Sequence, residues 1–179
     1  REAPKEKVEK ASFTQQVANR YAKPRIDIGV CLGSASFGVT TSDKAILQPA
    51  RVAIKESNGK IVALGSKAAE IEGREPEGVV VRSPIRNGVV ADARLAARLL
   101  SATIAASKHG LLSAPRIALA VPSNLSAVES QTLLATAKSA GASKVHLVDQ
   151  AMAAAIGAGR DLTVPEGHMV VHLGAGVTQ

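Results

Sequence analysis

The chain is 179 residues long, carries a formal charge of +7 and is 46% hydrophobic. That length suits one domain with a small appendage, and the basic charge suits a solvated face, an anionic membrane or a nucleic acid. Aromatic residues make up only 2%, which argues against base stacking with nucleic acid and leaves the core to aliphatic side chains. One cysteine, Cys31, excludes an internal disulfide framework and fits a reducing cytoplasm. No apolar run approaches the roughly 20 residues of a membrane span.

Residues 1–24 form a basic tail that differs from the rest of the chain. Residues 1–10 are charged and almost without apolar content, which is typical of a disordered lead-in rather than of a secretory signal. Because the first residue is not Met, we expect a fragment or a processed product. A helix is predicted over 12–21, opened by a capping serine and stopped by Pro24.

Short segments with alternating, β-branched residues follow the tail and predict strands. The expected strands are 26–30, 37–41, 45–47, 51–55, 60–64 and 79–81. A Gly-rich turn joins the first two, and Ser57-Asn58-Gly59 is a strong hairpin signal between two later ones. A short helix is expected over 66–72, closed by Gly73.

The second half of the chain alternates between helices and strands. Asp92 is expected to cap a long helix that ends at Lys108, with one buried face made by Leu95, Leu99, Leu100, Thr103 and Ile104. Ser126 and Glu129 form a capping box at the start of another helix. The remaining predicted elements are strands over 116–121, 144–148 and 168–173 and helices over 126–140 and 152–158. A meander followed by this alternation predicts an α/β domain with a mixed sheet.

Six stretches of the sequence contain distinctive motifs. They are 29–39 (GVCLGSASFGV), 46–65, 82–92 (RSPIRNGVVAD), 120–123 (AVPS), 147–159 (LVDQAMAAAIGAG) and 169–179. In these stretches the chain resembles the N-terminal part of the MreB and Mbl family of bacterial actins. The run Met-Ala-Ala-Ala-Ile-Gly at 152–157 is the most specific of the matches.

The resemblance implies an actin-like (ribonuclease H-like) α/β fold. Residues 25–179 would form domain I, residues about 43–82 its small inserted subdomain IB, and most of domain II would be absent. The family is implied to bind ATP and Mg²⁺ between its two domains. It is also implied to polymerise on the inner face of the membrane and guide cell-wall synthesis.

Two Gly-rich turns follow apolar strands, and such turns can present backbone N–H groups to phosphate oxygens. By resemblance they are the family's two phosphate hairpins, and we expect them to lie on adjacent turns. The phosphate-binding residues implied are Gly33, Ser34, Ala35 and Ser36 in the first turn and Gly174, Ala175, Gly176 and Val177 in the second.

Positions that carry acidic or hydroxyl groups in the family are changed here. Cys31 and His172 stand where the two hairpins have Asp, Gln150 where a Glu orients the attacking water, and Val177 where a Thr lies beside the γ-phosphate. Gln179 replaces a further Glu. Mg²⁺ prefers carboxylate and water oxygens, and a Gln can hold a water but cannot take its proton. We therefore predict no metal site and weak or absent ATP hydrolysis, while ATP binding stays open.

Cys31 and His172 are expected to face each other across the cleft. A Cys–His pair could act as a nucleophile or bind a soft metal, but the sequence offers no clear third ligand. Asp27 does not replace the missing carboxylates, because it lies earlier on the first strand, where it is interpreted as a polar residue at a strand end.

The tail has two interpretations. Phe13, Val17 and Tyr21 recur on one helical face, and with Arg20 and its basic neighbours they fit an amphipathic helix lying in an anionic membrane surface. The alternative is a helix docked on its own domain, or a linker.

The sequence favours an MreB-like cytoskeletal or scaffold protein in cell shape, cell-wall assembly or sporulation-type morphogenesis. It would be cytoplasmic or peripheral on the inner membrane. The expected partners are copies of itself or a full-length homologue, cell-wall morphogenesis proteins and anionic lipid, and not nucleic acid. Two alternatives stay open: an ATP-binding subunit whose other half lies elsewhere, and another actin-superfamily ATPase of the sugar kinase or chaperone type.

Overall fold

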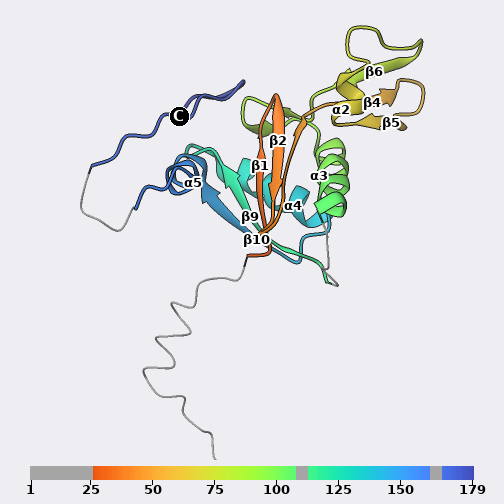
Figure 1. Cartoon of the computed structure of the whole chain (residues 1–179). Helices are drawn as coiled ribbons and strands as arrows, with labels where there is room; N and C mark the ends of the chain where they lie inside the picture. The colour runs from red at the N-terminus through yellow and green to blue at the C-terminus, as the bar shows by residue number, and fades with distance from the viewer. Residues whose placement is uncertain (1–25, 108–112, 162–166) are drawn as a thin grey trace, which may run out of the picture.

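A mixed five-stranded sheet forms the centre of the fold, in a computed structural model that describes residues 26–107, 113–161 and 167–179 (Figure 1). The strand order is β10-β9-β1-β2-β3. β1, β2 and β3 make an antiparallel meander, whereas β9 and β10 run parallel to β1. The strands are β1 (Ile28–Leu32), β2 (Ser36–Thr40), β3 (Ala45–Pro49), β9 (Arg116–Val121) and β10 (Lys144–Asp149).

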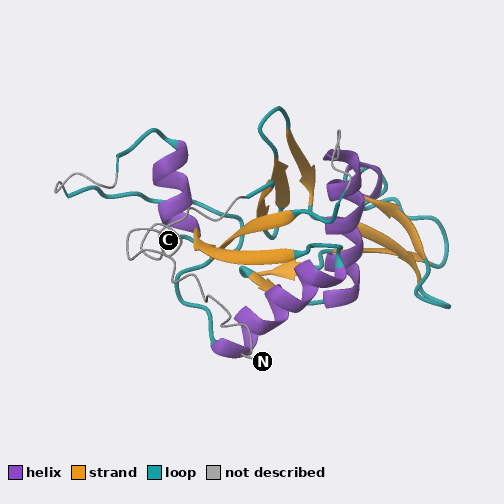
Figure 2. Ribbon diagram, turned by 90° about the horizontal axis from the view of Figure 1, so that it is seen from below, coloured by secondary structure: helices purple, strands orange, loops and turns teal. Residues whose placement is uncertain are grey.

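One face of this sheet carries large side chains and is covered by two helices, α3 (Ala93–Ser107) and α4 (Ala127–Ser139) (Figure 2). The sheet residues on this face are buried: Ile28, Val30, Phe37, Val39, Ile117 and Leu119. The helical face predicted for α3 is confirmed, because all five of its named residues are buried. The hydrophobic core therefore lies between the sheet and this helical layer.

Side chains fix the starts of the helices as the sequence predicts. The carboxylate of Asp92 accepts a 2.9 Å hydrogen bond from the amide of Leu95, ahead of α3. Ser126 and Glu129 form a complete capping box ahead of α4. Asp149 caps α5 (Gln150–Gly157) by accepting from the amide of Met152. Each cap satisfies amide donors that the first helical turn leaves free.

A second, smaller sheet lies beside the first, with strand order β5-β4-β6 (Figure 1). It is built from β4 (Val52–Lys55), β5 (Ile61–Leu64) and β6 (Val79–Arg82), with the short helix α2 (Ser66–Ala69) after β5. A two-stranded hairpin of β7 (Ile85–Arg86) and β8 (Val89–Val90) leads back to α3. Asn87 and Gly88 turn this hairpin with φ of 49° and 77°, the left-handed conformation that Asn and Gly adopt most readily.

Two sequence predictions need correction. The first strand begins at Ile28 rather than residue 26, because Asp27 binds Arg116 through its carboxylate, with contacts of 2.9 Å to the amide and 3.1 Å to the guanidinium. The strand predicted over 168–173 does not form; among the described residues only a single bridge between Leu173 and Thr178 is present there. A lone two-stranded pairing without further strands is marginal in water, which explains this outcome. The helix predicted over 12–21 lies outside the described residues.

Replacing Leu100 by Ala should destabilise the fold strongly. Leu100 is 0% exposed at the centre of the core, and emptying such a site costs about 2–5 kcal/mol in unfolding free energy. The matched control is Ala105→Ser on the exposed face of the same helix, where a change within about 0.5 kcal/mol is expected. Urea denaturation of both variants measures the difference. Equal losses would contradict this account of the core.

Candidate functional site

Two Gly-rich turns are each closed by the same kind of backbone hydrogen bond. The amide of Gly33 donates to the carbonyl of Ser36 at 3.0 Å, and the amide of Gly174 donates to the carbonyl of Val177 at 3.0 Å. A Cβ atom on Gly33 would lie 2.5 Å from the Ser36 carbonyl oxygen, and one on Gly174 would lie 2.7 Å from that of Val177. Both glycines are therefore required because the backbone passes too close for any side chain.

The two turns touch each other, as the sequence predicted. A Cβ atom on Gly176 would lie 2.5 Å from the hydroxyl oxygen of Ser34 and 3.0 Å from the Cα atom of Asn87. The carbonyl of Ser34 accepts from the hydroxyl of Ser83 at 3.0 Å and from the guanidinium of Arg51 at 3.3 Å. Ser83 and Arg51 thus hold the first turn through its Ser34 carbonyl, and the Ser34 hydroxyl contacts the second turn.

Four backbone amides in these turns are free of protein acceptors. In the described part of the chain, they donate no hydrogen bond to another residue: Ser34, Ala35, Ala175 and Gly176. Clustered N–H groups of this kind form concave sites for anions. The paired turns therefore carry four backbone donors with no acceptor among the described residues.

Three residues that the resemblance assigns to acidic positions of the family come together beside the turns. Cys31 lies near the end of β1, Gln150 opens α5 and His172 precedes the second turn. The amide nitrogen of Gln150 lies 3.4 Å from the Cys31 sulfur and 3.2 Å from Nε2 of His172. We call these three residues the neutral cluster. The expected pairing of Cys31 with His172 is thus mediated by the Gln150 amide.

The neutral cluster does not have the chemistry of a magnesium site. Burial raises the pKa of the Cys31 thiol, so the sulfur stays protonated rather than becoming the thiolate that attacks or binds soft metals. Over residues 26–107, 113–161 and 167–179, no group of three His, Cys, Asp or Glu side chains could hold a metal ion. Mg²⁺ requires oxygen ligands, and the cluster offers one amide oxygen.

A polar network that sequence reasoning missed lies next to this cluster. The carboxylate of Asp149 accepts a hydrogen bond of 2.5 Å from the hydroxyl of Ser123 and one of 2.9 Å from the amide of Met152. The side-chain oxygen of Gln179 accepts from the amide of Ser123 at 3.1 Å. The hydrogen bond from the Ser123 hydroxyl, and after it the one from the Met152 amide, lower the pKa of Asp149. Only the bond to Met152 had a local signal, because an Asp directly before a helical run is a typical N-cap.

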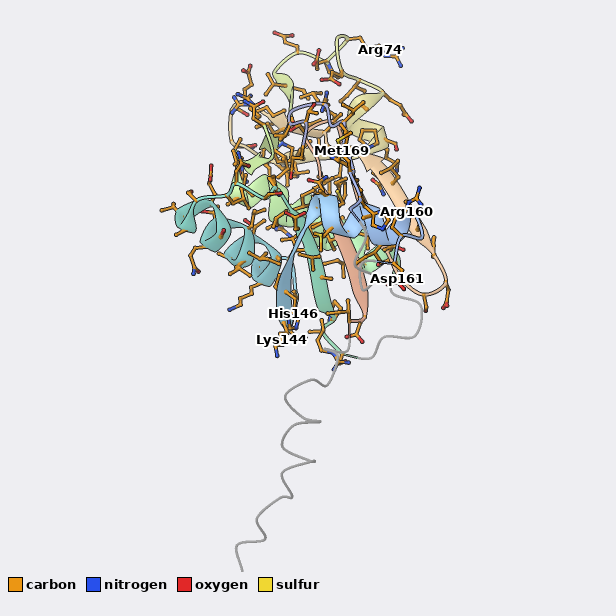
Figure 3. The ribbon with its side chains drawn as sticks, turned by 90° about the vertical axis from the view of Figure 1, so that its left-hand side faces the viewer. Arg74, Lys144, His146, Arg160, Asp161 and Met169 are labelled. Atoms are coloured by element: carbon orange, nitrogen blue, oxygen red, sulfur yellow. The ribbon has the colours of Figure 1, made fainter. Side chains whose placement is uncertain are left out.

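Two buried polar atoms in this region have no partner among the described residues, Nδ1 of His172 and Nε2 of Gln179. Unpaired buried groups cost free energy that a ligand or a bound water would recover. Figure 3 views β10 and α5 face-on, with Lys144 and His146 at the lower end of β10 and Met169, just before the second turn, at the upper end. The first Gly-rich turn follows the end of β1, whereas Lys144 lies beside Arg116 at the opposite end of the sheet.

A mixed sheet, an adjoining small sheet and two touching phosphate-type hairpins define an actin-like α/β domain. The described structure matches MreB5 of Spiroplasma citri bound to ADP with a TM-score of 0.75 and 25% identity, over 87% of this chain and 50% of that one. The fold also matches the MamK double helical filament with a TM-score of 0.64 at 21% identity, over 74% of this chain and 43% of that one. The predicted actin-like fold is confirmed.

The MreB/Mbl protein family matches residues 25–179, and the chain belongs to that family. Mbl of Bacillus subtilis (strain 168), a cell shape-determining protein, is 35% identical over 155 residues, which are 85% of this chain and 46% of Mbl. The cell shape-determining protein MreB of Escherichia coli (strain K12) is 31% identical over 161 residues, which cover 86% of this chain and 46% of that protein. The chain therefore spans about half the length of these relatives.

Replacing Asp149 by Asn should lower stability at neutral pH and have less effect in acid. Because the folded-state pKa lies below the unfolded value, the carboxylate stabilises the fold above the unfolded pKa of about 3.9, and this stabilisation is lost as pH falls through the folded-state pKa. Asn retains the cap but not the charge. Ser123→Ala should move the Asp149 pKa back upward in an NMR titration. A stability difference that stays constant with pH would contradict the role given to the charge.

Proposed function

We propose that this chain is an MreB-like scaffold component of bacterial cell shape or cell-wall assembly, with a phosphate site that no longer uses a metal. The observation that carries the proposal is the neutral cluster of Cys31, Gln150 and His172 beside two intact turns. Membership of the MreB/Mbl family, whose relatives are cell shape-determining proteins, supports the scaffold role.

The two turns are the part of the site that we assign to nucleotide. Their free amides would hold phosphate oxygens, with Ser36 and Val177 closing the turns through their carbonyls. Solved relatives from Spiroplasma citri are bound to ADP and to AMPPNP, which supports ADP or ATP as the ligand here.

We propose that the neutral cluster lacks the groups that ATP hydrolysis requires. Gln150 can orient a water but cannot accept its proton, and its amide nitrogen is already directed at Cys31 and His172. Asp149 is the nearest carboxylate in sequence, and its oxygens accept from Ser123 and Met152 instead. We therefore propose that ATP hydrolysis is negligible and that the nucleotide, where bound, is a structural ligand.

Association with other copies of the fold is a function that such a domain can perform without hydrolysing ATP. We propose that residues 25–179 act as domain I, with the β5-β4-β6 sheet as its small subdomain, and that the chain associates with itself or a full-length homologue. Met152 and Ile156 on α5 are about half exposed at 49% and 60%, which gives such a partner an apolar contact. Cell-wall morphogenesis proteins are further candidate partners. None of the described helices is long and apolar enough to cross a membrane.

The second candidate function is that of an ATP-binding subunit completed by another chain. The free amides of Ser34, Ala35, Ala175 and Gly176 favour it, because they are an intact half of a phosphate site. The two candidates differ in whether Mg²⁺ and turnover take part, and this can be measured directly.

The wild-type chain should bind ADP with the same affinity in Mg²⁺ and in EDTA, and should release phosphate from ATP at the background rate. The triple variant Cys31→Asp, Gln150→Glu, His172→Asp should bind more tightly in Mg²⁺ than in EDTA, because it restores oxygen ligands. Titration calorimetry of both proteins measures this.

The matched control is the triple variant Cys31→Asn, Gln150→Glu, His172→Asn, which supplies similar volume but only one carboxylate. It should show much less dependence on Mg²⁺, and thermal melts check that all variants fold. Metal-dependent binding together with phosphate release by the wild-type chain would favour the second candidate.

A further inference from the structure

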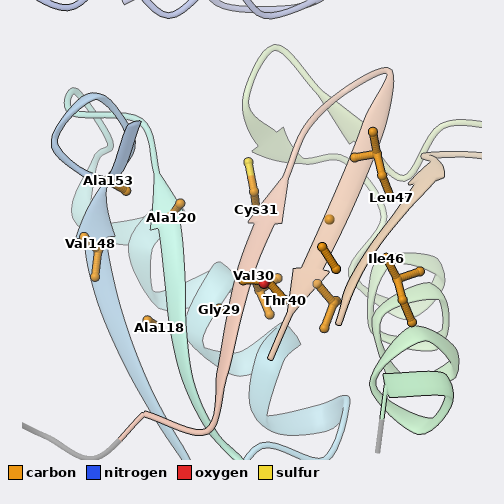
Figure 4. Close-up of a pocket in the computed structure, with 13 residues that line it drawn as sticks. Gly29, Val30, Cys31, Thr40, Ile46, Leu47, Ala118, Ala120, Val148 and Ala153 are labelled. Atoms are coloured by element: carbon orange, nitrogen blue, oxygen red, sulfur yellow. The ribbon is translucent and has the colours of Figure 1, made fainter. Parts of the chain in front are cut away.

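The first Gly-rich turn lies beside the segment that leads from the large sheet into the small one. In Figure 4, Cys31 on β1 and Leu47 on β3 lie toward the same end of the large sheet. β3 ends at Pro49, which pairs with Ser36 at the start of β2, so the chain leaves β3 next to the turn. The next two residues connect β3 to β4 of the small sheet. The link between the two sheets therefore starts at the turn.

The two central carbonyl groups of this turn accept hydrogen bonds from that link. The backbone amide of Ala50 donates to the carbonyl of Ala35 at 2.8 Å. The guanidinium of Arg51 donates to the carbonyl of Ser34 at 3.3 Å. By contrast, the amides of Ser34 and Ala35 have no acceptor in the described part of the chain. The link therefore holds the acceptor groups of the turn and leaves its donor groups free.

The bond from Arg51 fixes the direction of an amide that belongs to the phosphate site. The Ser34 carbonyl and the Ala35 N–H are two ends of one peptide unit, and in a planar trans peptide they point in opposite directions. The peptide bonds of the described residues are all trans. A donor that holds the Ser34 carbonyl therefore also directs the Ala35 N–H to the side away from Arg51.

A second donor near the same carbonyl, the hydroxyl of Ser83, is less committed to it. This hydroxyl lies 3.0 Å from the Ser34 carbonyl oxygen and 2.7 Å from that of Ile85, and its one proton can serve only one of them at a time. Nη1 of Arg51 has two protons, one for Ser34 and one for the carbonyl of Ala50 at 3.2 Å. Arg51 is therefore the donor that can hold the Ser34 carbonyl without giving up another bond.

The small sheet holds Arg51 in turn. Nε of Arg51 lies 2.8 Å from each carboxylate oxygen of Glu72, in the turn that follows α2, and the Arg51 carbonyl accepts from the amide of Gly65, just ahead of α2, at 2.9 Å. The two side chains are 25% and 47% exposed, and an ion pair this exposed adds little to stability. Its effect is geometric, because a planar guanidinium that is held at Nε has the direction of its Nη1 protons restricted.

We propose that Arg51, held by Glu72, is a positioning residue that keeps the Ala35 amide directed at a bound phosphate. This inference rests on the proposed phosphate role of the turns. A phosphate oxygen on the Ala35 N–H makes the Ser34 carbonyl a better acceptor, because linked hydrogen bonds polarise one another. The 3.3 Å bond from Arg51, longer than the usual range of about 2.7–3.2 Å, can then shorten. Phosphate binding and attachment of the small sheet to the turn thereby strengthen each other.

The orientation is tested first in the full chain without ligand. Arg51→Met keeps most of the side-chain volume and removes the donor. NMR should then show shifts of the Ser34 carbonyl carbon and the Ala35 amide nitrogen, because both atoms belong to the peptide unit that loses the hydrogen bond. The matched control is Arg74→Met on the same loop as Glu72, since Arg74 donates to the carbonyl of Glu70 at 2.8 Å and not to the turn (Figure 3). It should leave both resonances in place.

Titration calorimetry with ADP in EDTA separates positioning from charge. Arg51→Met should weaken binding by about two- to tenfold, the range expected when one hydrogen bond is lost. Glu72→Gln removes a negative charge, which by itself would tighten the binding of an anion. Positioning predicts the opposite, weaker binding, because the carboxylate that holds Arg51 is lost. Adding Glu72→Gln to Arg51→Met should cause no further loss, since Glu72 acts through Arg51.

Ser34 and Ala35 resonances that do not move in Arg51→Met would overturn the proposal. So would Glu72→Gln binding ADP as tightly as the wild-type chain or more tightly, or Arg74→Met weakening binding as much as Arg51→Met. A wild-type chain that does not bind ADP would contradict the proposed function instead, and the resonances of the free protein would then decide this inference alone. Thermal melts confirm that each variant folds.

Discussion

The close approach of the two hairpin turns is the constraint on which the site depends. The backbone of Gly176 lies against the hydroxyl of Ser34 and the backbone of Asn87, and no side chain fits between them. This contact brings residues from opposite ends of the described chain together and fixes where β1, the β7–β8 hairpin and the second turn meet. It also places Cys31 and His172 on either side of Gln150, so that three neutral side chains meet at one point.

Neutral side chains meet at that point and interact by hydrogen bonding. Three carboxylates in contact would need a cation to offset their repulsion, whereas a thiol, an amide and an imidazole can pack together without one. The raised pKa of Cys31 follows from the same burial. The turns keep their backbone donors because those amides do not depend on side-chain identity. The proposed function therefore separates recognition of phosphate from activation of water.

The sequence predicts most of this architecture from local signals. The capping box at Ser126, the buried face of α3 and the parallel strand at 116–121 are all short-range patterns, and the structure confirms them. The strand predicted over 168–173 failed because an apolar run does not reveal whether a neighbouring strand is present to pair with it. The contacts of Asp149 with Ser123 and of Gln150 with both Cys31 and His172 join distant segments, so no local pattern could show them.

The central claim is that the paired turns bind phosphate without a metal. Backbone amide shifts of Ser34, Ala35, Ala175 and Gly176, followed by NMR while ADP is added in EDTA, test it most directly. The account predicts that all four amides shift together and that later addition of Mg²⁺ changes neither the shifts nor the affinity. Amides that stay unmoved in EDTA and shift only when Mg²⁺ is present would contradict it.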